Sequence, residues 1–262
     1  MRESKQAVRA DEYPDKDFKT SHTIEVALLM AAGMGARIRP LSEDTPKPLI
    51  PIKGIPMIES LIQSIQSAGI KEIIVAVGYK KEKYYYLADR YDGITFVENK
   101  EYQSKNTISS FYAARNLIHD RNCIVSESDL FVSDPTIVKN ETDISRYYIR
   151  DVGPQDYEWG FCLDNGDRIR KIVRPKANVF LDHHMYGFAY WVKDDLNQIV
   201  KEVERAYKSR GHEDLAYDEV INRLYGKLNV GVLRLASGQL YEIDNLDDLV
   251  GVDPSYASFL NN

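Results

Sequence analysis

A cationic loop rich in glycine and proline is the part of this sequence whose residue types are best suited to chemistry. Between Gly33 and Pro48 the chain carries two glycines, two arginines, three prolines and a lysine. Glycines allow backbone N–H groups to close on a phosphate without obstruction by a Cβ atom. Arg37, Arg39 and Lys47 add cationic donors, and the prolines restrict the loop in advance, which reduces the entropy lost on binding. The loop therefore predicts a cradle for a triphosphate.

Two common phosphate-binding motifs do not match this loop. A Walker A loop ends in Gly-Lys-Ser/Thr, and this loop does not. The G-x-G-x-x-G pattern of dinucleotide-binding folds requires a third glycine where Arg37 and Ile38 stand. A loop that is merely rigid is the other alternative, but a lysine and an arginine at these offsets have no packing reason. The sequence thus favours a phosphate cradle of a different kind.

Two aspartates are placed to hold the divalent cation that accompanies a triphosphate. A bound triphosphate is normally accompanied by Mg²⁺, which carboxylates hold. Asp129 follows the apolar stretch CIVSES at the end of an expected strand, and Asp244 follows LYEI at the end of a later one. The plainer alternatives are a turn residue for Asp129 and a helix N-cap for Asp244. We expect both to bind Mg²⁺, with Glu127 and Asp247 as weaker candidates.

The composition is that of an ordinary soluble globular protein. The chain has 262 residues, a net charge of -6 and 44% hydrophobic residues, enough for a sizeable core in one large or two small domains. The negative charge argues against nucleic-acid binding through the surface as a whole. Two cysteines, Cys123 and Cys162, are too few for a disulfide framework. We therefore expect a cytoplasmic protein. Because no apolar run approaches the length needed to cross a bilayer, we expect no membrane insertion.

The elements that must position the loop alternate between strands and helices. Residues 1–22 are polar and lack periodicity, which predicts a flexible extension. Beyond them, short apolar runs alternate with amphipathic segments, the βαβ rhythm of a Rossmann-like, mainly parallel sheet flanked by helices. The expected strands cover residues 25–31, 71–78, 94–99 and 123–132, and the expected helices cover 56–69, 80–91 and 106–118. Since ligands bind beyond the carboxyl ends of such strands, the loop after residue 31 is well placed.

After residue 133 the pattern changes to alternating strands followed by helices. Expected strands cover residues 144–152, 157–164 and 168–175, and an expected helix covers 194–209. Antiparallel strands and helices of this kind commonly form a smaller lobe over the mouth of a parallel sheet. The sequence therefore predicts an α/β fold with a smaller antiparallel and helical lobe.

The loop resembles the signature of the nucleotidyltransferase family. The stretch AAGMGARIRPLSEDTPKPL is similar to G-x-G-[S/T]-R-x-x-P-x-T-x-x-x-P-K, with Ala36 in place of the usual hydroxyl and Ser42 in place of threonine. Across residues 24–250, the segments VGYKKEKYYYLADRY, NTISSFYAAR, YEWGFCLDNGDRIRKI and LYEIDNLDDL resemble bacterial CTP:phosphocholine cytidylyltransferases. The resemblance implies one nucleotidyltransferase domain over residues 23–262, with a nucleotide-binding half to about residue 133 and an acceptor-binding lobe after it.

The resemblance also implies a reaction and a set of site residues. CMP would pass from CTP to phosphocholine, giving CDP-choline and pyrophosphate, with Mg²⁺ on Asp129 and Asp244. The implied catalytic cations are Lys47, Arg37 and Lys176. The implied nucleotide-binding residues are Ala31, Ala32, Gly33, Gly35, Gly78, Tyr79, Asn106 and Ser110. Asn106 is equally suited to be the N-cap of its own helix.

The acceptor pocket falls in the less patterned half of the chain. A quaternary ammonium has no N–H to donate and is best held by aromatic faces with carboxylates nearby. We call a site of this kind an aromatic box. The candidates for it are Trp159, Glu158, Tyr186, Tyr190, Tyr217, Asp214 and Asp218. With eighteen tyrosines in the chain, each tyrosine is as well suited to the core or the surface. Trp159 beside Glu158 is the best of these candidates.

Three other functions remain open from the sequence. The acceptor could be 2-aminoethylphosphonate, whose primary ammonium would favour Glu158, Asp214 or Asp218 over an aromatic cage. A sugar 1-phosphate is a further acceptor. A nucleotide-sensing domain without catalysis is the alternative from another class, and the joint presence of Lys47 with two metal-binding aspartates argues against it. The oligomeric state, including a homo-oligomer, is left open.

Overall fold

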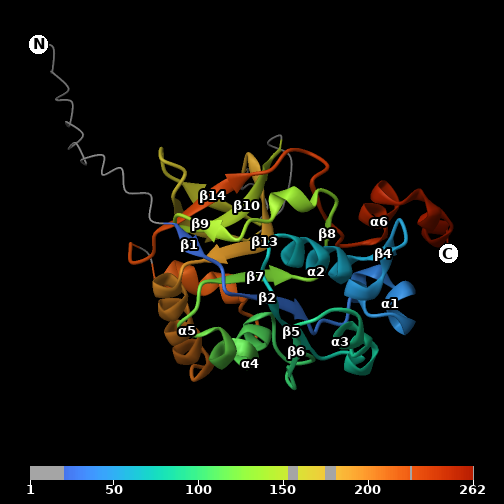
Figure 1. Cartoon of the computed structure of the whole chain (residues 1–262), viewed down its shortest axis with the longest axis horizontal. Helices are drawn as coiled ribbons and strands as arrows, with labels where there is room; N and C mark the ends of the chain where they lie inside the picture. The colour runs from blue at the N-terminus through green and yellow to red at the C-terminus, as the bar shows by residue number, and fades with distance from the viewer. Residues whose placement is uncertain (1–20, 153–158, 175–180, 225, 262) are drawn as a thin grey trace, which may run out of the picture.

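A seven-stranded sheet forms the centre of the molecule. The computed structural model describes residues 21–152, 159–174, 181–224 and 226–261. In Figure 1 the sheet runs from β14 at the top to β6 at the bottom, in the order β14, β10, β13, β7, β2, β5, β6. These strands are β2 (Val26–Ala31), β5 (Glu72–Val77), β6 (Ile94–Glu98), β7 (Cys123–Glu127), β10 (Ser145–Asp151), β13 (His183–Trp191) and β14 (Val230–Arg234).

Most neighbouring strands in this sheet are parallel. β2 pairs in parallel with β5 and β7, β5 pairs in parallel with β6, and β10 pairs in parallel with β14. Only β13 runs antiparallel, to both β7 and β10. All six residues of β2 are buried, because a parallel strand covered on both faces reads as a continuous apolar run. The predicted mainly parallel α/β fold is confirmed, and strands from the second half of the chain extend the same sheet.

Helices cover both faces of the sheet because β2 directs alternate side chains to opposite sides. Leu29 belongs to the core cluster under α2 (Met57–Ser67). Leu28 belongs to the cluster formed with α4 (Ile108–Ile118) and α5 (Lys193–Tyr207) on the other face. The period-two alternation of the strand and the helical spacing of the apolar residues thus produce a three-layer core.

The strand expected over residues 123–132 is broken in the structure. β7 ends at Glu127, and β8 (Leu130–Val132) pairs instead with β15 (Leu240–Glu242). The backbone N–H of Ile243 donates to the carbonyl of Asp129 (3.1 Å), which fixes the bend between the two strands. The break releases Asp129 from the sheet at its carboxyl edge.

The C-terminal segment returns to the N-terminal loop. α6 (Leu246–Val252) and η6 (Pro254–Asn261) follow β15, and Figure 1 shows α6 beside α1 and β4. Ile243 and Leu249 are buried in one cluster with Ile38 of the loop. Residues from the two ends of the chain therefore share a small core next to the cradle.

Shorter elements complete the fold. A 3₁₀ turn and a short helix replace the single helix expected over residues 80–91. None of the helices in the described ranges combines the length and the apolar composition that a membrane span requires. Of the extension predicted over residues 1–22, residues 1–20 lie outside the described residues and His22 belongs to β1. The remaining elements are β1 (His22–Thr23), η1 (Ala36–Ile38), α1 (Leu41–Asp44), η2 (Lys47–Leu49), β3 (Pro51–Ile52), β4 (Ile55–Pro56), η3 (Lys81–Tyr84), α3 (Tyr86–Arg90), η4 (Pro135–Ile137), β9 (Glu141–Thr142), β11 (Gly160–Leu163), β12 (Ile169–Val173) and η5 (Tyr217–Arg223).

Candidate active site

The cationic loop leaves the carboxyl end of β2 and closes on Lys47. Gly35 has φ +60°, and a Cβ atom at this position would lie 2.8 Å from Lys47 Cβ. Glycine is therefore the residue that permits both the left-handed backbone and the close approach. The Ser42 hydroxyl donates to the carbonyl of Gly35 (2.7 Å), so the serine that departs from the family signature still braces the loop.

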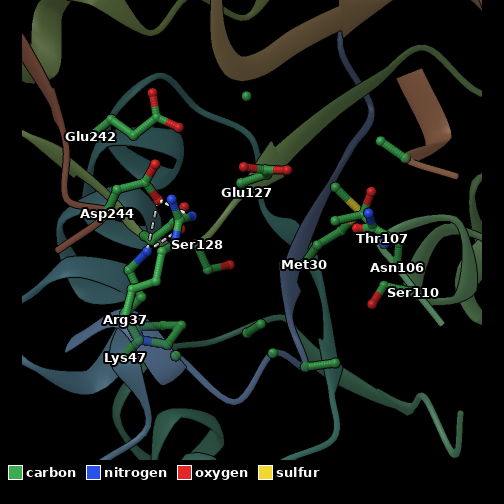
Figure 2. Close-up of a pocket in the computed structure, with 18 of the residues that line it drawn as sticks. Met30, Arg37, Lys47, Asn106, Thr107, Ser110, Glu127, Ser128, Glu242 and Asp244 are labelled. Carbon is green, nitrogen blue, oxygen red and sulfur yellow. Dashed lines mark hydrogen bonds and ion pairs between the residues drawn. The ribbon is translucent and has the colours of Figure 1, made fainter. Parts of the chain in front are cut away.

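Lys47 lies between the two predicted metal-binding aspartates. Its Nζ is 2.7 Å from Asp129 Oδ2 and 3.2 Å from Asp244 Oδ1, and Arg37 Nη2 lies 2.7 Å from the same oxygen of Asp244. Figure 2 shows these cations grouped at one end of the pocket. Burial alone would lower the pKa of Lys47, but the two carboxylates outweigh it and hold the pKa above its ordinary value. The lysine is thus a fixed positive charge.

Asp244 does not have the plainer role that the sequence left open, whereas Asp129 does lie at the bend between β7 and β8. The N-cap of α6 is Asn245, whose side chain accepts from the Asp248 backbone N–H (3.0 Å), so the Asp244 carboxylate does not cap the helix. Asp129 Oδ1 is buried and has no hydrogen-bond partner among the residues that the structure describes. Asp247, the weaker candidate, is exposed.

The arrangement of Asp129 and Asp244 fits a divalent cation. Both carboxylates contact the same ammonium group, so they lie within reach of a single ion. The unpartnered Asp129 Oδ1 is a hard oxygen donor of the kind that Mg²⁺ prefers, and Mg²⁺ commonly takes one or two protein carboxylates together with substrate phosphates. No group of three or more His, Cys, Asp or Glu side chains suited to a metal ion occurs in the described residues.

A cavity of about 440 Å³ opens beside these groups. Figure 2 shows Arg37 and Lys47 at one end, Asn106 and Ser110 at the other, and Glu127 between them. The lining includes twelve of the predicted site residues, namely Ala31, Ala32, Gly33, Gly35, Arg37, Lys47, Asn106, Ser110, Asp129, Trp159, Asp218 and Asp244. One pocket therefore joins the cationic loop, the acidic pair and part of the second half of the chain.

Comparison with known proteins decides the family. A sequence model of nucleotidyl transferases matches residues 26–145. The chain is 36% identical over 236 residues to the 2-aminoethylphosphonate cytidylyltransferase of Lancefieldella rimae, covering 90% of this chain and 95% of that protein. The chain belongs to the nucleotidyltransferase family.

Two further similarities of this nucleotidyltransferase concern another acceptor. It is 30% identical to the choline-phosphate cytidylyltransferase of Streptococcus pneumoniae, covering 85% of this chain and 94% of that protein. The solved structure of the CTP:phosphocholine cytidylyltransferase from Streptococcus pneumoniae matches with a TM-score of 0.80 at 29% identity, covering 88% of this chain and 99% of that one. The fold is thus that of the nucleotidyltransferases.

Two of the predicted nucleotide-binding residues of this nucleotidyltransferase support the pocket from behind. Gly78 and Tyr79 follow β5 and are not part of the lining. A Cβ atom on Gly78 would lie 3.0 Å from Ala32 Cβ and 2.8 Å from the Tyr102 ring. The Tyr79 backbone N–H donates to the carbonyl of Ala32 (3.1 Å). Both residues therefore hold the strand end that lines the cavity.

Asn106 is not the N-cap of its helix. The N-cap of α4 is Thr107, and Asn106 Oδ1 accepts from the Thr107 backbone N–H (2.7 Å). Asn106 Nδ2 donates to the carbonyl of Asp214 (3.3 Å). Asn106 therefore ties the start of α4 to the segment before η5. Asn106 also lines the cavity.

The prediction that two tyrosines of β13 belong to the aromatic box is wrong, because both lie in the core. Met185 and Gly187 line the cavity, so Tyr186 and Tyr190 belong to the opposite face of the strand. Both are buried in the core under α2. The Tyr186 hydroxyl donates to the carbonyl of Leu240 (3.0 Å), and the Tyr190 hydroxyl lies 2.8 Å from that of Tyr148. Neither ring is available to an acceptor.

The structure places Tyr217 and Asp214 outside the pocket lining as well, so the predicted aromatic box does not include them. Tyr217 is fully buried and stacks on Phe111, with ring centroids 4.9 Å apart. Asp214 is exposed and does not line the cavity; its backbone carbonyl accepts from Arg174 Nη2 (2.8 Å). Glu158 and Lys176 lie outside the described residues. Trp159 and Asp218 are thus the predicted acceptor residues that line the pocket.

Two further acids lie in the pocket wall, namely Glu127, which the sequence indicated only as a weaker metal candidate, and Glu242, which it did not single out. Both line the cavity, and Figure 2 shows Glu242 on the same side as Asp244 and Glu127 toward the middle. Burial, followed by the charges of Asp129 and Asp218, raises the pKa of Glu127 well above its ordinary value. Glu127 ends β7 two residues before Asp129, so the same strand-end pattern indicates both.

Glycine on the neighbouring strand makes room for Glu127. A Cβ atom on Gly187 would lie 2.9 Å from Glu127 Oε2.

Asp218 is buried as well, and its Oδ1 accepts from the Tyr147 hydroxyl. Burial raises the pKa of Asp218 to about 6, although hydrogen bonds from Tyr147 and Tyr217 offset part of this effect. The pocket therefore contains two buried acids, Glu127 and Asp218, whose pKa values lie above their ordinary values.

Proposed function

We propose that this nucleotidyltransferase is a cytidylyltransferase that transfers CMP from CTP to 2-aminoethylphosphonate and releases pyrophosphate. The observation that carries the choice of acceptor is the wall of the pocket. Among the described lining residues, Trp159 contributes the single aromatic ring, whereas acids are numerous. The tyrosines that would complete a cage for a trimethylated ammonium are core residues. The 36% identity to a 2-aminoethylphosphonate cytidylyltransferase supports the same choice.

A primary ammonium group suits the acids of this wall. It carries three N–H donors, which require carboxylate or carbonyl acceptors, whereas a quaternary ammonium has none and relies on aromatic faces. Glu127 and Asp218 both line the cavity and are not paired to a cation in the described residues. The guanidinium of Arg174 lies 5.4 Å from the centroid of the Trp159 ring and already uses its π-system. We therefore assign Glu127 and Asp218 to the ammonium end of the acceptor.

The cationic end of the pocket suits the triphosphate. Lys47, Arg37 and the backbone amides of the glycine loop offer donors and positive charge, and Ala31 and Ala32 leave room for a flat base. A phosphonate oxygen attacks the α-phosphorus in line; a new P–O bond forms, and the bond to the β-phosphate oxygen breaks with its electron pair leaving on pyrophosphate. The attacking oxygen is already ionised at neutral pH, so alignment and charge stabilisation perform the catalysis.

The two aspartates are assigned to a magnesium ion. Asp129 and Asp244 would hold it, and when bound it neutralises charge on the triphosphate. Lys47 contacts both aspartates in the structure, so it keeps them together and compensates their charge. The lysine and the acidic pair are thus parts of one electrostatic unit.

Phosphocholine is the second candidate acceptor. Trp159 lines the pocket, and a tryptophan face is the best single partner for a trimethylated ammonium. The choline-phosphate cytidylyltransferase of Streptococcus pneumoniae, at 30% identity, supports this alternative. The two acceptors differ in what they require from Glu127, because only the primary ammonium donates hydrogen bonds.

Pyrophosphate release measured with matched acceptors tests the proposal. CTP with 2-aminoethylphosphonate should give a kcat/KM at least tenfold above that with phosphocholine, and the reverse order would favour phosphocholine. Turnover with glucose 1-phosphate alone would indicate a sugar nucleotidyltransferase. CTP binding by calorimetry without pyrophosphate release from any acceptor would indicate a sensing domain.

A pair of variants tests the ammonium site. Glu127→Gln should raise KM for 2-aminoethylphosphonate by about tenfold, since the amide oxygen still accepts a hydrogen bond but the carboxylate charge is lost, and that charge contributes about 1–1.5 kcal/mol. Asp214→Asn is the matched control, because it also removes one acid but lies outside the lining. Equal KM values for Glu127→Gln and the wild type would remove Glu127 from the site.

A further inference from the structure

A buried amide lies directly behind the end of the pocket that Ser110 lines. Asn99 follows β6 and is 3% exposed. Its Nδ2 donates to Ser109 Oγ (2.8 Å) and to Ser110 Oγ (3.0 Å), and its Oδ1 accepts from the backbone N–H of Glu101 (2.9 Å). Asn99 therefore uses its whole amide to join the end of β6 to the first turn of α4.

The neighbouring backbone fixes which way this amide faces. A backbone N–H can only donate, so the group facing Glu101 must be the amide oxygen. The NH₂ group of Asn99 then faces the two serines, and each of its protons is donated to one hydroxyl oxygen. Exchanging the oxygen and nitrogen would leave two donors facing each other at Glu101 inside the protein, with no acceptor for either.

The fixed amide sets the direction of the serine hydroxyls. A hydroxyl that accepts from Asn99 retains its own proton for a bond elsewhere. Ser109 donates its proton to the carbonyl of Asn106 (2.8 Å). Ser110 accepts from Asn99 and lines the cavity, and in the described residues its hydroxyl donates no hydrogen bond. Ser110 consequently offers a hydrogen-bond donor to whatever occupies this end of the pocket.

We propose that Asn99 is a positioning residue that makes Ser110 a donor toward N3 of the nucleotide base and thereby selects cytosine over uracil. Cytosine N3 is a bare acceptor, whereas uracil N3 carries a hydrogen and would oppose the Ser110 proton. Figure 2 shows Ser110 at the end of the pocket away from Lys47 and Arg37, the end left for the base when the phosphates lie on the cations. The inference rests on the proposed function, since it requires a nucleoside triphosphate in this pocket.

Reversing the hydrogen-bond polarity of residue 99 tests the inference. Asn99→Asp has nearly the same shape, but a carboxylate only accepts, so Ser110 would turn its proton toward residue 99 and present a lone pair to the base. The ratio of kcat/KM for CTP to that for UTP should fall at least tenfold, through a higher KM for CTP and a lower KM for UTP. Asn116→Asp is the matched control, because Asn116 is exposed on the same helix and its variant should keep the wild-type ratio.

A second variant keeps the test decisive if Asn99→Asp does not fold. Ser110→Ala removes the donor without entering the buried amide network, and it should lower the CTP to UTP ratio to a similar extent. Adding Asn99→Asp to Ser110→Ala should not lower the ratio further. A wild-type ratio in folded Ser110→Ala or Asn99→Asp, or an equal loss with both nucleotides, would overturn the inference. A wild-type enzyme that releases no pyrophosphate from CTP would refute the proposed function instead.

Discussion

Lys47→Met removes the ammonium group at the centre of the site while it keeps most of the buried stem. Nζ lies 2.7 Å from Asp129 Oδ2 and 3.2 Å from Asp244 Oδ1, so each pair attracts with on the order of 5 kcal/mol at an effective dielectric constant of about 20, before desolvation. The same charge faces the triphosphate in our proposal. Losing one preorganised donor of this kind raises the barrier by about 3–4 kcal/mol, which lowers kcat by about 10²- to 10³-fold.

The assay for this variant combines turnover with stability. Pyrophosphate release under saturating CTP gives kcat, and urea titration gives the free energy of unfolding, which should fall by about 2 kcal/mol as the aspartates lose their shared partner. Lys201→Met is the matched control, because Lys201 is an exposed lysine of α5. A folded Lys47→Met enzyme with a kcat within threefold of the wild type would remove Lys47 from the mechanism.

Three smaller perturbations address the loop, the metal and a buried acid. Gly35→Ala should lower kcat at least tenfold and the free energy of unfolding by about 1–3 kcal/mol. The reason is that Gly35 has φ +60° and that the new Cβ would lie 2.8 Å from Lys47 Cβ. Normal kinetics and normal stability in urea would contradict this prediction. EDTA should abolish pyrophosphate release, and excess Mg²⁺ should restore it. The Asp129→Asn variant should need more Mg²⁺ than the wild type for half-maximal turnover. Turnover that resists EDTA would exclude the proposed ion. Because burial raises the pKa of Asp218 to about 6 from 3.8, the folded state holds this proton more tightly and the free energy of unfolding falls as pH rises between these values. Asp218→Asn should therefore gain stability relative to the wild type across pH 4–7, by up to about 3 kcal/mol in urea titrations, and a constant difference would refute the shifted pKa.

The sequence predicted best what short-range patterns specify. The continuous apolar run of β2 and the glycines and prolines after it indicated a loop at the carboxyl edge of a parallel sheet, and the structure has it there. Asp129 and Asp244 were indicated by strand ends, and the structure brings both to Lys47. Even the break between β7 and β8, which the sequence did not show, leaves Asp129 at the predicted edge.

The acceptor wall could not be predicted because its residues depend on which face of a strand turns inward. In β13 the alternation places Met185 and Gly187 toward the cavity, and the tyrosines between them pack in the core on the other face. An aromatic residue at the correct distance along the chain is therefore no guide without the strand register. Asn99 escaped notice for a related reason, since its hydroxyl partners lie about ten positions away on α4.

The return of the C-terminal segment to the loop has a consequence for biosynthesis. Arg37 and Asp244 form an ion pair although 207 positions separate them. Until the segment around Asp244 has emerged from the ribosome, the nascent polypeptide already has its glycine turn and Asp129 but has no Asp244 to meet them. Competence for turnover therefore cannot arise before the segment around Asp244 has been made and has folded back onto the loop.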